Sequence, residues 1–323
     1  MNSTHHQTKS ILFPNGVPPQ SKFAEKPINS SKKVFKASSE SALEPAWFFQ
    51  FQNSQQKNLR DDIDLAANSK LDTLIIGETG SGKELVARTL YKQHLKRNYL
   101  SIEDAPFIAI NCGAIPENLA ESILFGHERG AFTSARERQY GRFEQAKRGI
   151  LFLDEIQALA PSTQVKLLRA IQERKIDRLG SKSSSEINCR VIAATNIPLE
   201  ILVEEGQFRT DLYYRLNICH IYLPPLRKRG ADFSNITLGV QKYLNEKLNI
   251  PLREISRQCF EALEQYNWPG NIRELEHCLL YASIRTSNTI ELTHLPPSLR
   301  KDCAHYLKDG NWDIVMQKKI HQQ

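Results

Sequence analysis

Short apolar runs alternate with amphipathic stretches through the middle of the chain. Five runs have the length of a strand and are bounded by polar or glycine-containing segments: 71–76, 107–110, 150–153, 189–194 and 218–223. Strands that are covered on both faces are almost continuously apolar, so these runs predict a buried parallel sheet with helices on both sides. The pattern therefore predicts a three-layer α/β domain over residues 46–229.

A helical pattern follows this region. From residue 231 the apolar positions recur at helical spacing, and Ser256 is predicted to be a helix N-cap. One predicted helix carries apolar side chains on a single face: Ile272, Leu275, Cys278, Leu279 and Ala282. Residues 230–298 are predicted to form a small all-helical lid domain.

The two ends of the chain lack such patterns. Residues 1–45 are rich in Ser, Asn, Lys and Pro and have too little clustered apolar surface to offset the entropy of ordering, so we predict a disordered arm. Residues 299–323 are short and polar apart from Trp312, Ile314 and Val315. They are predicted to form a C-terminal tail.

Composition narrows the class of protein. The content of 40% hydrophobic and 24% charged residues is that of a globular protein. No run approaches the ~18 apolar residues of a membrane span, and the N-terminus is polar, which predicts a cytoplasmic protein. The six scattered cysteines indicate neither a disulfide framework nor a zinc site. The net charge of +7 fits either a nucleic-acid partner or a mildly basic surface.

The first chemical motif joins the predicted strand 71–76 to a helical stretch. Glycines let backbone amides turn toward phosphate groups, the helix N-terminus is positive, and a lysine supplies a point charge to the β- and γ-phosphates. Strand, loop, lysine and helix together favour a nucleotide-binding loop over a merely flexible turn. The motif reads Gly77, Glu78, Thr79, Gly80, Ser81, Gly82, Lys83 and Glu84. Glu84 replaces the usual Ser or Thr, whose hydroxyl binds Mg²⁺, so another residue has to hold the metal.

The second motif ends the apolar strand 150–153 with two acids, Asp154 and Glu155. Carboxylates at the C-terminal end of a buried strand lie beside the nucleotide in an open α/β sheet. There Asp154 can hold Mg²⁺ and Glu155 can orient the attacking water. Consecutive strand residues point to opposite faces, so we expect the two acids to have different tasks. An Asp-Glu pair alone would more often be a solvated strand end or helix cap, and the phosphate loop favours the catalytic interpretation.

Residues from about 74 to 282 resemble the central AAA+ ATPase domain of the sigma-54-dependent transcription activators, also called bacterial enhancer-binding proteins. The matching segments are GETGSGKE, FIAINCGAIPENLAESILFGHERGAFTSA, ILFLDEI, KLLRAIQE, RVIAATN, FRTDLYYRLN, LPPLRKR and WPGNIRELEH. That family also has Glu at the position of Glu84. The resemblance implies an ATPase that uses ATP and Mg²⁺, assembles as a homo-oligomeric ring, expected to be a hexamer, and remodels the sigma-54 RNA polymerase holoenzyme to promote open-complex formation.

The resemblance implies roles for individual residues around the nucleotide. Asn111 matches a polar residue that holds the catalytic glutamate, here Glu155, in a switchable hydrogen bond, and an amide offers both donor and acceptor. Thr195 and Asn196 match the first sensor of the γ-phosphate, although Thr-Asn by itself is as often a turn or cap. Arg273 matches the second sensor, which couples the lid to the nucleotide; its alternative is an exposed helix charge.

Two further arginines match residues that act between subunits. Arg209 and Arg215 correspond to arginine fingers that reach the neighbouring subunit's nucleotide site. Such a residue stabilises charge on the transferred phosphoryl group. Without the FRTDLYYRL context, both would be read as surface charges.

One segment resembles the GAFTGA loop that contacts sigma-54. It comprises Gly130, Ala131, Phe132, Thr133, Ser134 and Ala135, called the GAFTSA loop below. An apolar ring among small residues predicts an exposed partner-binding tip, the alternative being a buried aromatic at the loop base. Ser134 replaces the usual Gly and would strain the loop if that position needs positive φ. Two alternatives therefore stay open: a related regulator that does not productively engage sigma-54, and a generic AAA+ remodelling ATPase.

Two modules common in the family are not predicted. Residues 1–45 do not suit a receiver or ligand-binding domain. We therefore expect that a separate protein controls the ATPase or that such control is absent. Residues 299–323 resemble at most the beginning of a helix-turn-helix, so direct binding to promoter or enhancer DNA stays open.

Overall fold

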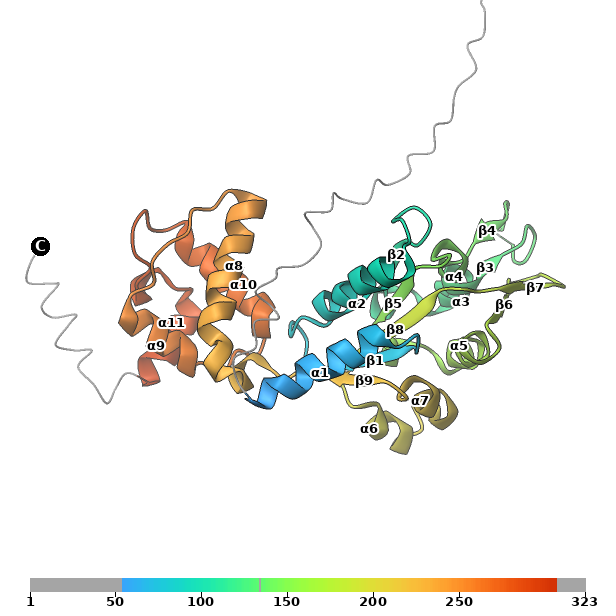
Figure 1. The fold of residues 1–323 in the computed structure, drawn as a ribbon, viewed down its shortest axis with the longest axis horizontal. Coiled ribbons are helices and arrows are strands. Elements are labelled where there is room, and N and C mark those ends of the chain that lie inside the picture. The colour runs from blue at the N-terminus through green and yellow to red at the C-terminus, as the bar shows by residue number, and fades with distance from the viewer. Residues whose placement is uncertain (1–53, 134, 307–323) are drawn as a thin grey trace, which may run out of the picture. The chain divides into compact units, whose positions relative to one another are not determined.

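The computed structural model describes residues 54–133 and 135–306, and a five-stranded parallel sheet forms the centre of its α/β domain. The strands lie in the order β2-β5-β8-β1-β9, and every neighbouring pair is parallel (Figure 1). All five predicted apolar runs are confirmed as strands: β1 (Thr73–Ile76), β2 (Phe107–Asn111), β5 (Ile150–Asp154), β8 (Arg190–Thr195) and β9 (His220–Tyr222).

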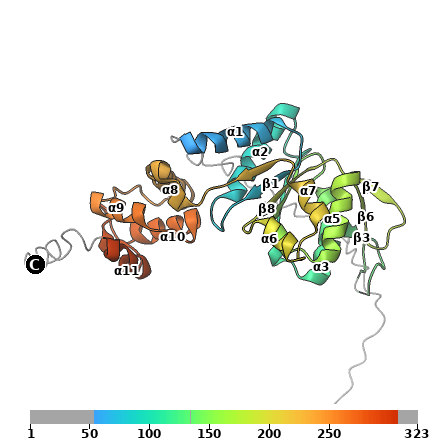
Figure 2. The ribbon, with the colours of Figure 1, turned by 90° about the horizontal axis from the view of Figure 1, so that it is seen from below.

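Helices cover both faces of the sheet, which confirms the predicted three layers. In β5, Ile150 and Phe152 pack on one face and Leu151 and Leu153 on the other, as the alternation of a strand requires. Figure 2 shows α1 and α2 on one side of β1 and β8, with α3, α6 and α7 on the other. The covering helices are α1 (Ser54–Asn68) and α2 (Lys83–Asn98) on the first face, and α3 (Glu117–Phe125), α5 (Pro161–Glu173), α6 (Leu199–Glu204) and α7 (Thr210–Leu216) on the second.

Two short hairpins lie together at one end of the α/β domain (Figure 1). The first pairs β3 (Gly126–His127) with β4 (Gln139–Tyr140) and carries the GAFTSA loop between its strands. The second pairs β6 (Lys175–Asp177) with β7 (Ser184–Glu186). A bridge between His127 and Leu179 joins the hairpins, and α4 (Arg142–Gln145) follows the first.

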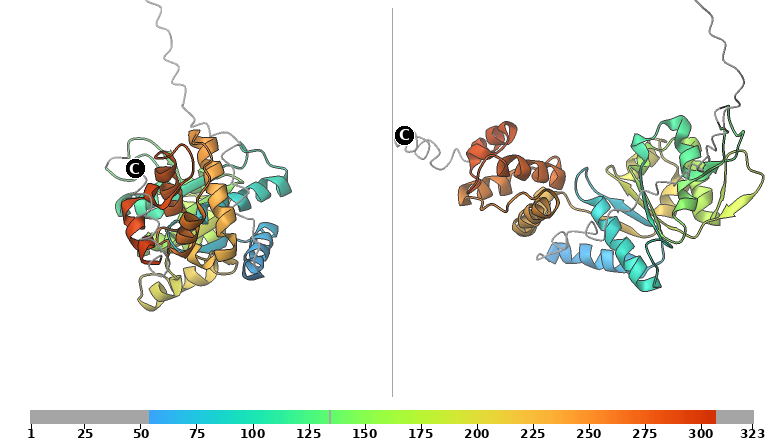
Figure 3. Two further views of the ribbon diagram at one scale, coloured as in Figure 1. Left: turned by 90° about the vertical axis from the view of Figure 1, so that its left-hand side faces the viewer. Right: turned by 90° about the horizontal axis from the view of Figure 1, so that it is seen from above.

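Four helices form the predicted lid: α8 (Phe233–Leu248), α9 (Arg257–Gln265), α10 (Asn271–Ser283) and α11 (Pro297–Tyr306). They are packed together in both views of Figure 3, drawn in orange and red. The five predicted core residues of α10 are all buried, and Trp268 packs among the same side chains. Ser256 is confirmed as the N-cap of α9, because its hydroxyl accepts a hydrogen bond from the backbone N–H of Cys259 at 3.3 Å.

The C-terminal limit of the lid differs from the predicted boundary at residue 298. Helix α11 crosses that boundary, and Leu299 is buried in the lid core. The segment around Leu299 is too short and polar to give a clear periodic signal, although Leu299 continues the packing of the domain. The predicted arm 1–45, residue Ser134 and the tail from residue 307 lie outside the described residues. Within the described ranges, no helix has both the length and the apolar character needed to cross a bilayer.

Candidate active site

The phosphate loop, residues 77–84, connects β1 to the start of α2. Gly80 and Gly82 adopt φ values of 76° and 101°, which glycine reaches without steric cost. Lys83 is the first residue of α2 and is only 8% exposed. Its Nζ donates hydrogen bonds to the carbonyl oxygens of Gly77 at 2.8 Å and Glu78 at 3.1 Å. The loop therefore wraps around the lysine ammonium at a helix N-terminus, an arrangement suited to phosphate groups.

Asp154 is the last residue of β5 and lies in the electrostatic field of Lys83. Burial raises the pKa of Asp154, and the Lys83 ammonium opposes this rise. Burial in turn lowers the pKa of Lys83, with Asp154 and Glu155 acting in the opposite direction. Opposite charges at close range stabilise each other's ionised forms. The structure therefore brings together the lysine and the two acids that the two motifs contribute.

Glu155 does not continue the strand, which corrects one step of the sequence interpretation. Its φ and ψ are 53° and 47°, the left-handed region, and it forms the N-cap of a short 3₁₀ helix, η4 (Ile156–Ala158). The pleat of a strand therefore does not separate the two acids. A turn in the left-handed conformation reorients Glu155 instead, and such conformations in non-glycine residues are a recognised source of local strain at functional sites.

Asn111 ends β2 beside β5, where the register pairs it with Asp154. Its side-chain oxygen accepts a hydrogen bond from the backbone N–H of Ala114 at 3.0 Å, which caps the 3₁₀ helix η3 (Cys112–Ala114). No hydrogen bond joins Asn111 to Glu155 among the described residues. A Cβ placed on Gly113 would contact both Glu155 Oε2 and, at 3.3 Å, Asn111 Oδ1. Gly113 therefore leaves the space in which the two side chains approach each other.

Asn196 follows β8 and contacts the phosphate loop directly. Its amide nitrogen donates to Thr79 Oγ1 at 3.2 Å, and its oxygen accepts from Gln157 Nε2 at 2.7 Å. Thr195 is buried at the end of β8 and donates its hydroxyl to the Ile197 carbonyl at 2.6 Å. Asn196 thus lies at the loop, whereas Thr195 shapes the turn beyond the strand. Gln157, which the sequence motifs did not single out, positions the Asn196 amide.

The lid also holds the phosphate loop. The backbone N–H of Ile272 donates to the Gly80 carbonyl at 3.0 Å, and Asn271 Nδ2 donates to the Thr79 carbonyl at 3.0 Å. Asn271 is fully buried, and its Oδ1 accepts from the backbone N–H of Leu226 at 2.8 Å. Arg273 lies two residues after Asn271 and close to the phosphate loop. A Cβ added to Gly80 would lie 3.2 Å from the Arg273 Cβ.

Arg227 extends these contacts through an ion pair with Glu78, whose closest atoms are 2.6 Å apart. Hydrogen bonds from Arg227 lower the pKa of Glu78. Sequence reasoning did not assign roles to Arg227 or Asn271, although both lie in segments that carried the resemblance. Only the resemblance of the whole segments could have indicated these two residues, because neither an arginine nor an asparagine alone predicts such a contact.

The two predicted finger residues lie apart from this cluster. Arg209 is exposed at the start of α7 and pairs with Asp211 at 2.7 Å. Arg215 is half-buried on α7 and donates to the Ile171 carbonyl at 3.3 Å. Within the described chain, neither side chain forms a hydrogen bond or ion pair with the phosphate loop.

The GAFTSA loop is anchored mainly at its ends. The backbone N–H of Gly130 donates to the Ala135 carbonyl at 2.8 Å, and that of Ala135 donates to the Phe132 carbonyl at 2.9 Å. Ala135 is buried, whereas the Phe132 side chain is 37% exposed and rests edge-on against His127 with ring centroids 4.9 Å apart. Phe132 is therefore partly exposed in the loop, with His127 covering part of its ring.

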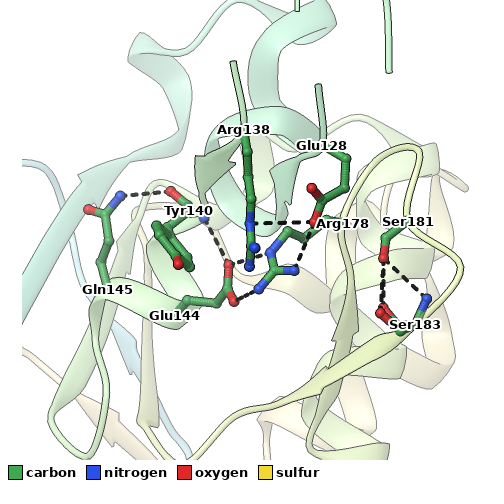
Figure 4. Close-up of polar contacts among 9 residues, drawn as sticks. Glu128, Arg138, Tyr140, Glu144, Gln145, Arg178, Ser181 and Ser183 are labelled. Atoms are coloured by element: carbon green, nitrogen blue, oxygen red, sulfur yellow. Dashed lines mark hydrogen bonds and ion pairs between the residues drawn. The ribbon is translucent and has the colours of Figure 1, made fainter. Parts of the chain in front are cut away.

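An ion-pair cluster joins this loop to the second hairpin. Arg178 follows β6 and pairs with Glu144 of α4 and with Glu128, which precedes the loop, at 3.0 Å (Figure 4). Arg138 contacts the same Glu128 at 3.5 Å from the other side of the loop. The side chains of Arg178 and Glu144 are 10% and 14% exposed, so water screens their interaction only weakly.

Comparison with protein families identifies both domains. The family described as the sigma-54 interaction domain matches residues 49–222, and the AAA+ ATPase lid domain family matches residues 227–309. The first match alone covers more than half of the chain.

The chain belongs to the family of sigma-54-dependent transcriptional activators.

Curated relatives agree with this assignment. The sigma54-dependent transcriptional regulator SfnR of Pseudomonas fluorescens is 45% identical over 277 residues, which cover 84% of this chain and 74% of SfnR. The Nif-specific regulatory protein of Azotobacter vinelandii is 42% identical over 71% of this chain but only 42% of its own length. The DNA-binding transcriptional activator HyfR of Escherichia coli is 42% identical, and the matched part covers 38% of HyfR. The matched part therefore spans less than half the length of these two relatives.

Solved structures establish the AAA+ fold of this family member. Crystal structures of NtrX from Brucella abortus, in complex with ATP and with ADP, match with a TM-score of 0.68 and 29% sequence identity. The match covers 77% of this chain and 54% of NtrX. Hsp104 from Saccharomyces cerevisiae matches with a TM-score of 0.53 at 18% identity, which supports the fold alone.

Proposed function

We propose that this chain hydrolyses ATP as a homo-oligomeric ring, expected to be a hexamer, and uses the energy to remodel the cytoplasmic sigma-54 RNA polymerase holoenzyme into the open complex. The observation that carries the proposal is the convergence of Lys83, Asp154 and Asn196 at the phosphate loop. Family membership supports the partner, and the ATP complex of NtrX supports the nucleotide.

The residues present fit ATP and Mg²⁺. Ser81 Oγ is buried in the phosphate loop and has no hydrogen-bond partner among the described residues, so the loop contains an unsatisfied polar group. Asp154 uses only Oδ1 for the backbone N–H of Glu155, at 3.0 Å, which leaves its other oxygen for a cation. Mg²⁺ sites in such enzymes commonly use one or two carboxylates together with substrate phosphates.

Each residue then has a distinct task. The Lys83 ammonium neutralises phosphate charge, and Asp154 would hold Mg²⁺, which would supply further positive charge to the phosphates during hydrolysis. Glu155 orients the attacking water, and Asn111 restrains Glu155 from across Gly113. Asn196 senses the terminal phosphate through its contact with Thr79. Arg273, Asn271 and Arg227 couple the lid to the same loop.

A mutant pair tests the hydrolytic part. Lys83→Ala should impair ATP binding, whereas Glu155→Gln should bind ATP but turn it over about 10² to 10⁴ times more slowly, the usual contribution of a positioned base. Glu246→Gln, on the exposed side of α8, is the control and should retain full turnover. Unchanged hydrolysis in both site variants, measured as phosphate release, would end the assignment.

The ring part depends on Arg209 acting across a subunit boundary. Its pair with Asp211 is solvent-exposed and contributes little, so the arginine is available for a neighbour at low cost. Arg209→Ala and Glu155→Gln should each be inactive alone and regain activity when mixed, because a mixed interface can combine an intact finger with an intact site. Wild-type specific activity should rise with concentration, and a monomer with concentration-independent activity would contradict the ring.

The sigma-54 part rests on the GAFTSA loop and is tested by open-complex formation with purified sigma-54 holoenzyme. Wild-type protein with ATP should form open complexes, and Glu155→Gln should not. Ser134 is the observation that favours the second candidate, a related regulator without productive sigma-54 engagement. A ring that hydrolyses ATP but forms open complexes only as Ser134→Gly would support that candidate. Hydrolysis with no sigma-54 engagement in either form would favour a generic remodelling ATPase.

A further inference from the structure

A polar cavity lies at the edge of the sheet opposite the phosphate loop. The cavity has a volume of about 460 Å³. Its lining comes from segments that precede β1, β5 and β8 and from the C-terminal ends of α2 and α5. Because the strands are parallel, this is the edge where they begin, whereas the phosphate loop follows the end of β1. Both sites can therefore be filled at the same time.

Basic side chains dominate the lining. Lys70, Arg148, Arg174 and Arg190 contribute four permanent positive charges, together with the imidazole of His94. No carboxylate belongs to the lining as the described residues form it. Asp72 lies outside the lining but contacts one of its cations. It pairs with Arg174 at 2.6 Å, and it accepts a hydrogen bond from the backbone N–H of Val191 at 2.9 Å. Asp72 therefore offsets the charge of Arg174, and the lining keeps a positive excess from the other three cations.

The cations divide into structural and free groups. Arg190 is 5% exposed and donates to the carbonyls of Leu71 and Ala66 and to Thr73 Oγ1, all at 2.8 Å, through Nε and Nη2. Those bonds fix the cavity wall. By contrast, the side chains of Lys70 and Arg148 are exposed and form no hydrogen bond or ion pair with any described residue. These two donors are available to a ligand without the loss of an internal contact.

The remaining groups suit binding better than catalysis. Burial raises the pKa of the Cys189 thiol to about 12, so the thiol stays protonated and is a poor nucleophile. Burial lowers the pKa of His94. Its Nε2 lies 2.9 Å from the Arg148 carbonyl and must donate to it, while Nδ1 lies 3.4 Å from the Asn98 amide nitrogen. Both ring nitrogens are thus engaged, and the imidazole serves to hold the wall.

We propose that this cavity binds a small phosphate-bearing molecule. The four lining cations give a field that favours a polyanion, and Lys70 and Arg148 are free to contact phosphate oxygens with charge-assisted hydrogen bonds. The volume is within the range of small-molecule sites, and the side chains of Leu100 and Ile187 supply an apolar wall for an organic part. A concave cavity of this size favours a small ligand over duplex nucleic acid, which requires an extended basic surface.

The test uses full-length protein saturated with ADP, so that the phosphate loop is occupied. Isothermal titration with guanosine 5′-monophosphate and, separately, inorganic pyrophosphate should each detect saturable binding at one site per chain. The relative affinity of the two probes distinguishes an organic phosphate from an inorganic one. The double variant Lys70→Ala/Arg148→Ala should weaken binding about tenfold or more, since each cation offers a charge-assisted contact.

The control is Arg60→Ala/Lys242→Ala, which removes the same net charge from exposed positions on α1 and α8 outside the cavity. It should change affinity by less than about twofold, which separates local contacts from the general field of the protein. Absence of binding by both probes, or an equal loss in both double variants, would overturn the proposal. Duplex DNA binding that requires Lys70 and Arg148 without binding of either small probe would also overturn it.

Discussion

The phosphate loop and the GAFTSA loop both contain glycines with positive φ, but the rest of the molecule holds them differently. The phosphate loop has Gly80 at 76° and is fixed by its own lysine, by Asn196 and by the lid. The GAFTSA loop has Gly130 at 82°, with no heavy atom within 4 Å of the place where its Cβ would be. The second loop is held by a few backbone hydrogen bonds within its own segment and by the contact of Phe132 with His127, and Phe132 stays partly exposed.

This difference matches two different tasks, nucleotide chemistry for the phosphate loop and partner binding for the GAFTSA loop. A catalytic loop requires fixed donors, because misplaced groups lose transition-state stabilisation. A loop that engages a partner needs an available apolar tip on a stable stem, and local freedom is compatible with that task. Substitutions in the first loop should therefore disrupt ATP binding, whereas substitutions in the second should affect the partner and leave hydrolysis intact.

The largest effect is expected for Gly80→Ala. The new Cβ would overlap the Gly270 carbonyl oxygen and lie 3.2 Å from the Arg273 Cβ, and the residue would keep an unfavourable positive φ. Overpacking and backbone strain together cost about 3 kcal/mol in the loop conformation seen here. If the loop relieves this cost by leaving the conformation that fits phosphates, ATP binding has to restore it, so ATP affinity should fall roughly 100-fold. Fluorescent ATP binding measures this loss. Gly206→Ala is the matched control, because Gly206 also has positive φ but open space around it, and its ATP affinity should be unchanged.

Arg178→Ala should have the next largest effect, through the stem of the GAFTSA loop. Removal of the guanidinium leaves Glu144 largely buried without its cation, and partial solvent access limits the cost to about 2 kcal/mol in the free energy of unfolding. Thermal unfolding should show a lower Tm. Sigma-54 binding should weaken while ATP turnover per folded ring persists. Arg142→Ala removes an exposed arginine of α4 and should leave Tm and sigma-54 binding unchanged. If both variants lost Tm and sigma-54 binding equally, the ion pairs of Arg178 would not be what stabilises the loop.

The sequence was sufficient for much of the fold and for part of the site. The three central strands β1, β5 and β8 were predictable because they are buried on both faces and therefore almost wholly apolar. The outer strands β2 and β9 are partly exposed, and their short apolar runs were still sufficient to predict them. The Gly77 to Glu84 loop was predictable because its chemistry is local. The left-handed turn at Glu155 was not, since an apolar pattern carries no information on φ. The pair of Arg227 with Glu78 joins residues 149 positions apart and follows only from the fold.

The basic cavity shows the same limit more clearly. Its cations come from separate segments, and no two of Lys70, Arg148, Arg174 and Arg190 belong to one motif. A net charge of +7 gave no indication of where charge would concentrate. Parallel strands gather their first residues at one edge, so the sheet topology assembles this cavity in the way it assembles the phosphate site at the other edge.

Phe132→Ala should have a smaller effect that is confined to the partner. Loss of the ring removes the exposed apolar contact at the loop tip, and we expect about tenfold weaker binding to sigma-54 in the presence of an ATP transition-state analogue. Hydrolysis should be unchanged, because the ring contacts His127 rather than the nucleotide cluster. Tyr214→Ala, which removes an exposed aromatic of α7, is the matched control for sigma-54 binding. A collapse of folding in Phe132→Ala would show that the ring is a core residue.

The smallest effect is expected for Gly130→Ala, the counterpart of Gly80→Ala. The new methyl group meets no neighbouring atom, so the only cost is that of a non-glycine residue at positive φ, about 1 kcal/mol. ATP affinity and turnover should equal those of wild-type protein, since the loop ends are held by backbone hydrogen bonds that alanine retains. Equilibrium unfolding and fluorescent ATP binding, measured side by side for Gly80→Ala and Gly130→Ala, give the comparison directly. If Gly130→Ala lowered ATP affinity as far as Gly80→Ala, the GAFTSA loop would be coupled to the nucleotide site as rigidly as the phosphate loop itself, and the separation of the two loops would be wrong.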